Sequence, residues 1–346
     1  MPRRTTPSTA LALGLVLAAA LTGCGAEVAG GPGTGHAPRD RSDHYPVIIE
    51  NCGVKTVYDK APRRVVTNDV NTAEIMFALG LADRMAGYVM PDDKGDVDSV
   101  PWKAAYGKVP WLSKKAITKE IALDAQADLV FAGWNYGFGE DNGLTPASLK
   151  KLGIGSYVLT ESCHNGRDGS ARGVMPPLEA LYADLTNLGK LFDVEDRAAA
   201  LVAKYRRQIA EAAAKAPAPS RRPTVFLYDD GRDKPLTSGR YAAPHDIITR
   251  AGGENVMKDL KDSWTSVGWE TVVARNPDVI VINDYGDTSA AQKKAFLMSF
   301  RPLADVPAIK HHRIYVMDYA DLVESPRNPA AISDLARYLR GVRPAG

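Results

Sequence analysis

The sequence predicts an α/β protein made of two similar units, and three observations support this fold class. Predicted strands alternate with predicted helices in both halves of the chain. The strands are short, unbroken runs of Val, Ile and Leu, which are typical of parallel sheets buried on both faces. A long amphipathic helix, predicted at residues 193–215, separates the halves. About 300 residues follow a predicted export signal, and this length suits two domains better than one.

The long helix is predicted from an apolar stripe along one side. The stripe consists of Val194, Ala198, Leu201, Val202, Tyr205 and Ile209. Asp193 is expected to cap the first turn, and Glu195 and Asp196 follow it where the helix dipole favours negative charge. Pro217 and Pro219 end the helix. A helix of roughly 20 residues is about 30 Å long, which is enough to join two units.

The first 23 residues are expected to be an export signal that is removed. Arg3 and Arg4 precede an apolar run at residues 10–21. The sequence that ends at Cys24 resembles the lipobox of bacterial lipoproteins, so Cys24 is expected to carry the lipid. An ordinary secretory signal with a chance cysteine is the alternative. The lipid anchor predicts a protein on the outer face of the cytoplasmic membrane.

Residues 24–44 are expected to form a flexible tether, because they are rich in Gly, Pro and Ala and lack apolar periodicity. No other apolar run is long enough to span a membrane, so the lipid is the expected membrane contact. The formal net charge of +2 falls to zero when residues 1–23, with two arginines and no acidic residue, are removed. A neutral chain with no basic stripe except on the long helix is not expected to bind nucleic acid.

Both units contain the same alternation of elements. Within the first unit, residues 45–192, strands are predicted at 47–51, 64–67, 85–89, 128–132 and 156–159, and helices at 72–79, 120–125 and 146–152. Within the second unit, residues 216–346, strands are predicted at 225–228, 279–282 and 313–317, and helices at 244–251, 270–274, 290–298 and 329–339.

One helix-strand segment occurs once in each unit. Glu120 precedes Asp128 by eight residues in the first unit, and Glu270 precedes Asp278 by eight residues in the second. Any two helix-strand segments share some features, but matched acidic positions favour a duplicated architecture.

Seven short motifs resemble, in order, those of substrate-binding lipoproteins of ABC importers for iron-siderophores, haem and vitamin B12. They lie at residues 62–66, 72–81, 127–130, 236–239, 251–256, 274–281 and 325–327. Each motif alone is weak, but together they are specific, and the resemblance extends from about residue 62 to about residue 338. It implies two Rossmann-like lobes joined by one long backbone helix, with the ligand in the cleft between the lobes.

The resemblance also implies a function without catalysis. The chain is expected to capture a ferric siderophore or related chelate and to deliver it, as a monomer, to an ABC permease dimer and its ATPase. Binding of cobalamin, haem or bare zinc or manganese is the alternative within this class. A secreted hydrolase or a surface adhesion lipoprotein are alternatives outside it.

The ligand is expected beyond the carboxyl ends of the strands, where loops rich in aromatic residues carry some cationic residues. Such loops suit a flat or chelated anionic organic ligand, although a single loop aromatic is as often a packing residue. The predicted ligand-binding residues are Trp111, Trp134, Asn135, Tyr136, Asp230, Arg240, Trp264, Tyr285, Tyr319 and Arg327. Arg327 also resembles the arginine of the family's Ser-Pro-Arg motif.

Glu120 and Glu270 are expected to dock onto the permease. In the resembling family, a glutamate on each lobe contacts arginines of the two permease subunits, and these residues stand at matching positions. Both residues also begin short helices, where a glutamate favours the helix dipole without any partner.

Neither a resident metal nor a cofactor is predicted. The histidines after the tether are His164, His245 and the pair His311–His312, and the pair is expected in a solvated turn before a strand. The sequence has no G-x-S-x-G, H-E-x-x-H or P-loop motif, and adjacent Asp229 and Asp230 lack a catalytic partner. The chain is therefore not expected to be an enzyme.

Cys52 and Cys163 remain after Cys24 takes the lipid. Two thiols outside the cytoplasm are expected to form a disulfide. Two buried free thiols are the alternative, and a metal site that includes His164 is a third.

Overall fold

The structure is a computed structural model that describes residues 43–90, 97–165, 171–215 and 222–344. The predicted export signal, Cys24 and nearly all of the predicted tether lie outside the described residues. Within the described ranges, no helix has the length and apolar character needed to cross a membrane.

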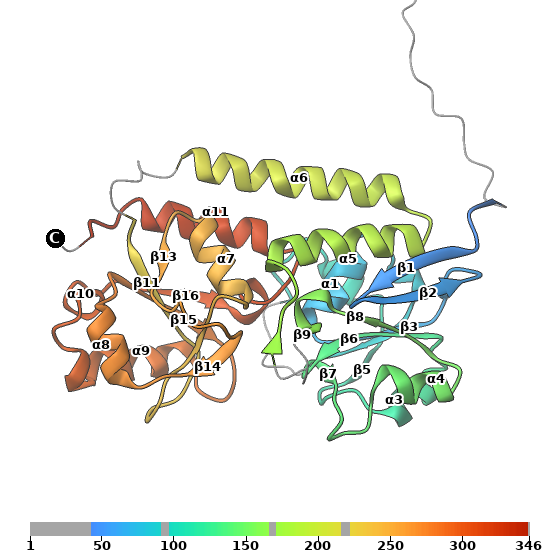
Figure 1. Cartoon of the computed structure of the whole chain (residues 1–346), viewed down its shortest axis with the longest axis horizontal. Helices are drawn as coiled ribbons and strands as arrows, with labels where there is room; N and C mark the ends of the chain where they lie inside the picture. Colours follow the sequence, from blue (N-terminus) through green and yellow to red (C-terminus); the bar gives the residue numbers. More distant parts are fainter. Residues whose placement is uncertain (1–42, 91–96, 166–170, 216–221, 345–346) are drawn as a thin grey trace, which may run out of the picture. The chain divides into compact units, whose positions relative to one another are not determined.

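Two parallel sheets form the centre of the molecule. The strands of the first sheet are β3 (Val65–Asn68), β4 (Met85–Val89), β5 (Trp111–Ser113), β6 (Leu129–Trp134), β7 (Gly137–Phe138) and β8 (Gly155–Val158). Their order is β5-β4-β3-β6-β7, and β8 also pairs with β6. The strands of the second sheet are β11 (Thr224–Tyr228), β13 (Glu254–Asn255), β15 (Val279–Asp284) and β16 (Ile314–Asp318). Their order is β13-β11-β15-β16, and all pairs are parallel. Strands with buried Val, Ile and Leu on both faces require helices on both sides, so the predicted fold class is confirmed (Figure 1).

Helices cover both sheets, and short antiparallel pairs complete each lobe. The first lobe contains α1 (Val70–Ala78), α2 (Lys103–Tyr106), α3 (Lys119–Asp124), α4 (Pro146–Lys151) and α5 (Pro177–Leu191), with hairpins β1 (Val47–Asn51) to β2 (Val54–Tyr58) and β9 (His164–Asn165) to β10 (Ala171–Arg172). The second lobe contains α7 (Ala243–Arg250), α8 (Trp269–Arg275), α9 (Ala290–Ser299), α10 (Pro307–Lys310) and α11 (Asn328–Leu339), with β12 (Leu236–Ser238) paired to β14 (Trp264–Ser266).

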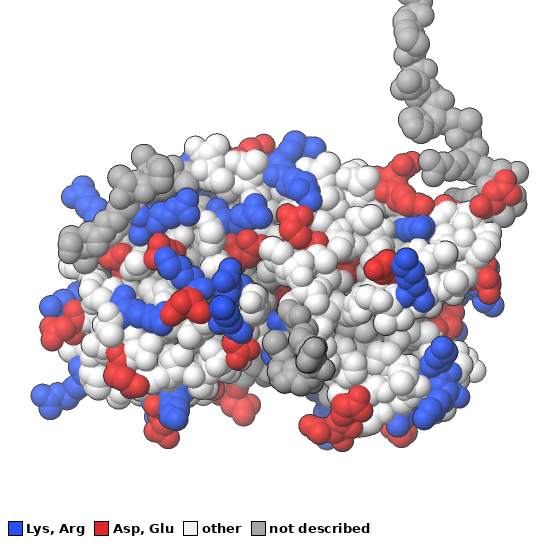
Figure 2. Space-filling model, in the orientation of Figure 1, with Lys and Arg blue, Asp and Glu red and all other residues white. Residues whose placement is uncertain are grey.

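The connecting helix α6 (Glu195–Ala214) lies across both lobes (Figure 1). It packs against α5 of the first lobe and α11 of the second. Four residues of the helix are buried, namely Ala198, Tyr205, Ile209 and Ala212. The first three belong to the predicted apolar stripe, so the stripe lies on the packed face of the helix. The other face is wet, as predicted, and Figure 2 shows basic side chains gathered over α6 and α7 with acidic side chains among them.

The predicted cap of this helix is wrong. Val194 is the N-cap residue, and no side chain caps the helix. Asp193 has φ 57 and ends α5 instead, because the amide of Val194 donates to the carbonyl of Gly189 at 2.8 Å in a left-handed turn. Asp193 thus belongs to the junction between two helices.

Helix α5 is absent from the predicted elements. Its buried leucines have the helical spacing that would have predicted it, at positions 178, 181, 185 and 188. The other predicted strands and helices are present within a few residues of their predicted bounds, and β4 has the predicted bounds.

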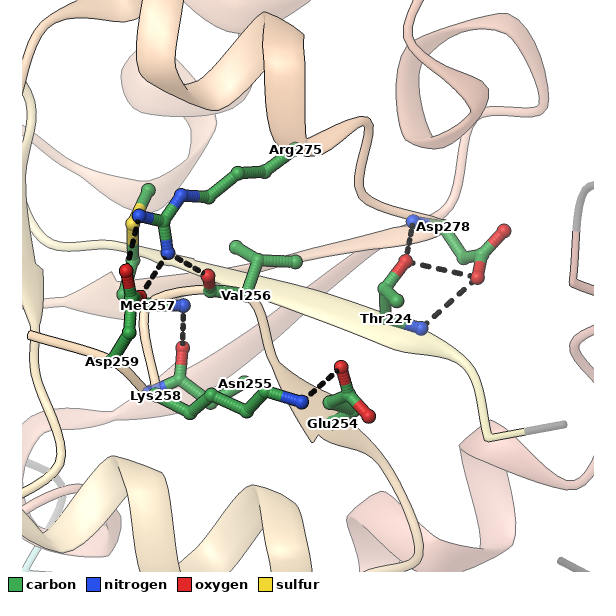
Figure 3. Close-up of polar contacts among 9 residues, drawn as sticks. All are labelled: Thr224, Glu254, Asn255, Val256, Met257, Lys258, Asp259, Arg275 and Asp278. Carbon is green, nitrogen blue, oxygen red and sulfur yellow. Dashed lines mark hydrogen bonds and ion pairs between the residues drawn. The ribbon is translucent and has the colours of Figure 1, made fainter.

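The repeated aspartates have the same structural role in both lobes. The carboxylate of Asp128 accepts hydrogen bonds from the amides of Arg63 and Arg64 at 2.7 and 2.9 Å, just before β3. The carboxylate of Asp278 accepts from the amide and hydroxyl of Thr224 at the start of β11, both at 3.0 Å (Figure 3). Each aspartate therefore holds the first strand of its lobe's parallel sheet, β3 or β11, against the strand that follows the aspartate, β6 or β15. This structural role accounts for the repeated aspartates without a contact to another protein.

A second set of contacts in Figure 3 fixes the end of α8. The guanidinium of Arg275 contacts the carboxylate of Asp259, at 2.9 Å for one of the two oxygens, and the carbonyl of Val256. The helix that begins near Glu270 is therefore tied to the loop after β13 at its other end.

A disulfide joins Cys52, in the turn of the β1–β2 hairpin, to buried Cys163. The Cα atoms are 5.4 Å apart, and the two residues are separated by 111 positions. In this structure neither cysteine is a free thiol or a metal ligand. The bond attaches the N-terminal hairpin to the segment that enters β9.

Candidate functional site

Four aromatic side chains from both lobes meet at the carboxyl ends of the sheets, and all four are among the predicted ligand-binding residues. Trp264 in β14 and Tyr136, which follows β6, are partly buried and pack against one hydrophobic cluster. Tyr285 packs against the same cluster, and Tyr319 belongs to it. The rings of Tyr285 and Tyr319 have their centroids 4.7 Å apart. The hydroxyl of Tyr319 donates to Oδ2 of Asp69 in the first lobe at 3.0 Å. These contacts place an aromatic surface where the lobes meet.

The loops of the first lobe are held in place by buried polar groups. Asn68, the last residue of β3, donates from Nδ2 to the carbonyl of Tyr136 at 2.6 Å and accepts the amide of Ile117 at 2.9 Å. Asn135, with φ 61, forms the tight turn before Tyr136. These bonds hold the backbone at Tyr136 and at Ile117 in place.

Asp69 has the most unusual backbone of the site. Its φ of 88 and ψ of 159 lie in a region that is almost restricted to glycine, and its side chain is buried. The carboxylate accepts from the amide of Val70 at 2.7 Å and from Tyr319. Such strain is concentrated at functional sites in proteins, which makes Asp69 a site residue that the list of predicted residues omitted.

The Tyr285 loop of the second lobe is held by a buried ammonium group. Lys293 on α9 donates to the carbonyls of Asn283 and Tyr285 at 2.8 and 2.7 Å. Burial lowers the pKa of Lys293, which nearby Asp229 and Asp230 oppose. The predicted residue Asp230 accepts the amide of Gly231 at 2.7 Å, so it also shapes the loop after β11.

The phenols of Tyr136 and Tyr319 remain protonated near neutral pH. Burial, followed by the charge of Glu161, raises the pKa of Tyr136, and Arg172 opposes this shift. The Arg172 guanidinium lies 5.8 Å from the centroid of the Tyr136 ring. Burial also raises the pKa of Tyr319, with a further contribution from Asp69. The site therefore combines neutral aromatic surfaces with a nearby cation, which suits recognition of a planar or chelated organic anion.

Arg240 lies beside a cavity of about 370 Å³ that residues from both lobes line. Its lining residues are Gly173, Val174, Met175, Pro176, Pro177, Arg240, Tyr241, His245 and Asp246. The Arg240 guanidinium is exposed and lies 5.8 Å from the centroid of the Tyr241 ring. It is therefore an accessible cation between the lobes.

Three of the predicted ligand-binding residues lie outside the group of four aromatic side chains. Trp111 stacks on Tyr88 and donates to the carbonyl of Met90 at 2.9 Å. Trp134 stacks on His164, with centroids 4.4 Å apart, and lines a separate cavity of about 390 Å³ within the first lobe. Arg327 is buried and forms an ion pair with Glu74. Their direct contact with a ligand stays a prediction.

Two buried carboxyl groups link the lobes. The amide of Glu161 donates to the Glu324 carboxylate at 2.8 Å, and the amide of Glu324 donates to the Glu161 carboxylate at 2.7 Å. Burial raises the pKa of both groups. Neither residue had a sequence signal, because their pairing depends on the packing of one lobe against the other.

A sequence profile that describes periplasmic binding proteins matches residues 65–320. The chain belongs to the periplasmic binding protein family. The expectation that this binding protein is not an enzyme is therefore confirmed, since its relatives are substrate-binding components of transport systems.

Two curated relatives resemble this binding protein over much of its length. An uncharacterized ABC transporter substrate-binding lipoprotein, YvrC, of Bacillus subtilis is 22% identical over 87% of this chain and 88% of its own. The vitamin B12-binding protein of Salmonella typhimurium is 27% identical over 64% of this chain and 72% of its own.

Two solved structures share the fold of this binding protein. A periplasmic binding protein from Veillonella parvula has a TM-score of 0.72 and 27% identity, and the match covers 84% of this chain and 96% of that one. A protein of an ABC-type Fe3+-hydroxamate transport system from Saccharomonospora viridis has a TM-score of 0.69 and 24% identity, with 85% and 99% covered. The likenesses agree with the two-lobed α/β fold described above.

Proposed function

We propose that this protein is the extracytoplasmic substrate-binding component of an ABC importer and that it captures a ferric siderophore or related metal chelate. Family membership supports the binding role, and a relative named petrobactin-binding protein YclQ, of Bacillus subtilis, is 22% identical over 77% of each chain. The protein delivers its ligand to a permease and carries out no reaction on it.

The meeting of Tyr136, Trp264, Tyr285 and Tyr319 is the observation that carries this proposal. Aromatic faces stack on planar ligands, and protonated phenols donate hydrogen bonds to anionic oxygens. Arg172 and Arg240 supply positive charge from the two lobes. A net anionic chelate with flat or aromatic groups satisfies all of these features.

A cobalamin-type ligand is the second candidate. The vitamin B12-binding relative supports it, and the same aromatic residues offer stacking surfaces to a large flat ring system. Titration of tryptophan fluorescence with ferric hydroxamates, ferric catecholates, haemin, cobalamin, Zn²⁺ and Mn²⁺ separates the candidates. We expect saturable binding of one class of ferric chelate, and saturable binding of none of the organic ligands would contradict both candidates.

Trp264→Ala and Arg240→Ala are each expected to weaken ligand binding by at least about tenfold, which corresponds to about 1.4 kcal/mol. The Trp264→Ala variant loses an aromatic stacking face, and the Arg240→Ala variant loses an accessible cation. Titration of each variant with the ligand found in the screen measures the effect. Arg301→Ala, at an exposed position of the second lobe, is the control. Unchanged affinity in both variants would remove them from the site.

The signal at residues 1–23 and lipidation of Cys24 complete the proposed location on the outer face of the membrane. The lipobox motif supports this anchor, and YvrC is named a lipoprotein. We expect cells to incorporate labelled palmitate into the wild-type chain and not into Cys24→Ser, and we expect Cys24→Ser to appear in the soluble exported fraction. Equal labelling of both chains would contradict the anchor.

Glu120 and Glu270 are the proposed contacts with the permease. Both are exposed in the first turn of matched helices, α3 and α8. Each helix also exposes an aliphatic residue three positions later, Leu123 at 48% and Val273 at 38%. Residues three apart share one face of a helix, so each lobe presents the same pair of an acidic and an apolar group. A permease dimer with two-fold symmetry requires such a repeated contact.

A further inference from the structure

The junction between α5 and α6 contains a histidine with a fixed orientation. His44 lies at the start of the described chain, and its side chain is 14% exposed. Its Nε2 atom is 2.8 Å from the carbonyl oxygen of Lys190, near the end of α5. A carbonyl oxygen only accepts hydrogen bonds, so Nε2 carries a hydrogen and donates it. The remaining ring nitrogen, Nδ1, is then the atom that a second group can bind.

Nδ1 of His44 faces two carboxylates. It is 3.5 Å from Oδ1 of Asp193 and 3.7 Å from Oε1 of Glu195. Hydrogen bonds between nitrogen and oxygen have typical lengths of about 2.7–3.2 Å, so neither distance describes a good one. With bonds of about 2.0–2.2 Å, two ligands of a tetrahedral zinc ion are separated by about 3.4 Å, which is close to both distances.

The backbone brings the two carboxylates together. Asp193 occupies the left-handed turn, with φ 57, that ends α5, and Glu195 is the first residue of α6. The ammonium group of Lys190, the residue whose carbonyl contacts His44, donates to the carbonyl of Ile48 at 3.1 Å. The side chains of Asp193 and Glu195 are 35% and 39% exposed, so water can reach the space between them.

We propose that His44, Asp193 and Glu195 bind a divalent transition-metal ion, of which Zn²⁺ fits best. The three ligand atoms lie within 4.8 Å of one another, and water supplies the fourth ligand. A hydrogen bond from the second ring nitrogen to a backbone carbonyl is the usual support of a metal-binding histidine, and the bond from His44 to Lys190 supplies it. The ion would fasten the end of the N-terminal tether to the start of the connecting helix, and it is independent of the transported ligand.

Sequence patterns alone do not indicate this site, because His44 belongs to the residues predicted as tether. The helical pattern accounts for Asp193 and Glu195 as a cap and a dipole residue of the long helix. Only the packing of residue 44 on the end of α5 brings the three side chains together.

Calorimetric titration of ZnCl₂ into metal-free protein tests the proposal. The chain from residue 25 onward is used without an affinity tag, because tags bind zinc. We expect one zinc ion per chain, with binding at least about tenfold weaker in His44→Ala and in Glu195→Gln. Asp193→Asn removes a carboxylate while keeping a residue that tolerates the left-handed turn, and we expect the same weakening. His311→Ala, at an exposed turn, is the matched control and should bind zinc as the wild type does.

Two results would overturn the proposal. The absence of saturable zinc binding to the wild type would reduce the cluster to side-chain contacts between His44 and the two carboxylates. Wild-type affinity in His44→Ala would place the bound ion elsewhere in the chain. Titration of His44→Ala with the transported ligand, for which we expect wild-type affinity, separates this site from the aromatic site between the lobes.

Discussion

Replacement of both Glu120 and Glu270 by arginine is expected to abolish transport while ligand affinity and melting temperature stay near their wild-type values. Both residues are exposed in the first turns of α3 and α8, and neither is among the aromatic residues of the candidate ligand site. In the proposed complex, two glutamates meet cationic groups of the permease, so the substitutions would place like charges against each other. Cellular uptake of labelled ligand measures transport, and titration and thermal unfolding of the purified variant measure the other two properties.

Local hydrogen bonds favour the ionised form of the Glu120 carboxyl group. Hydrogen bonds from its own backbone amide and from the hydroxyl of Thr118 hold the pKa of Glu120 below its usual range. The carboxylate of Glu270 folds over Gly268 at the start of α8. Both charges therefore also favour their helix termini, and only a transport measurement distinguishes this role from docking.

The controls separate charge from position. Glu211→Arg reverses an exposed charge on α6, on a helix that the proposed docking does not use, and is expected to leave uptake unchanged. Leu123→Ser with Val273→Ser removes the apolar member of each pair and is expected to reduce uptake without reversing any charge. Wild-type uptake by the Glu120→Arg, Glu270→Arg variant would reduce both glutamates to residues that begin helices.

Local patterns predicted most of the fold. The buried strand at Met85–Val89 and the stripe of the connecting helix follow from residues close in sequence, so periodicity alone finds them. The pairs β12–β14 and β9–β10 were not predicted, because two- and three-residue strands carry no periodic signal. The prediction that Asp193 caps the long helix is wrong, because this residue ends one helix immediately before the next begins.

The sequence predicted which loops form the candidate ligand site, but not which of their side chains face it. Alternation of strands and helices places the residues after β6, β15 and β16 at the same edges, which is why Tyr136, Tyr285 and Tyr319 were found. The direction of a loop side chain depends on its tertiary neighbours, so nothing in the sequence separates Trp134, which turns to His164, from Tyr136. Asp69 gains its role from a partner 250 positions away.

Arg327→Ala is expected to lower the free energy of unfolding by about 3–5 kcal/mol, because it leaves a buried carboxylate without its partner. The Arg327 guanidinium is 8% exposed, and its Nε donates to Glu74 Oε2 at 2.8 Å, while Glu74 is fully buried. Tyr106, whose phenol pKa is raised by burial and by Glu74, donates to the same carboxylate at 3.0 Å. Urea unfolding measures the loss.

The same experiment decides between the two roles of Arg327. Arg337→Ala, at an exposed position of α11, is expected to change stability by less than about 0.5 kcal/mol. Arg327→Met combined with Glu74→Gln removes both charges and is expected to recover much of the stability that Arg327→Ala loses, since no unpaired charge remains buried. If Arg327 contacts the ligand instead, Arg327→Ala will keep its stability and lose affinity. The buried pair joins α1 of the first lobe to the start of α11 in the second. We therefore expect the loss to appear as a lower free energy of unfolding of the whole two-lobed structure.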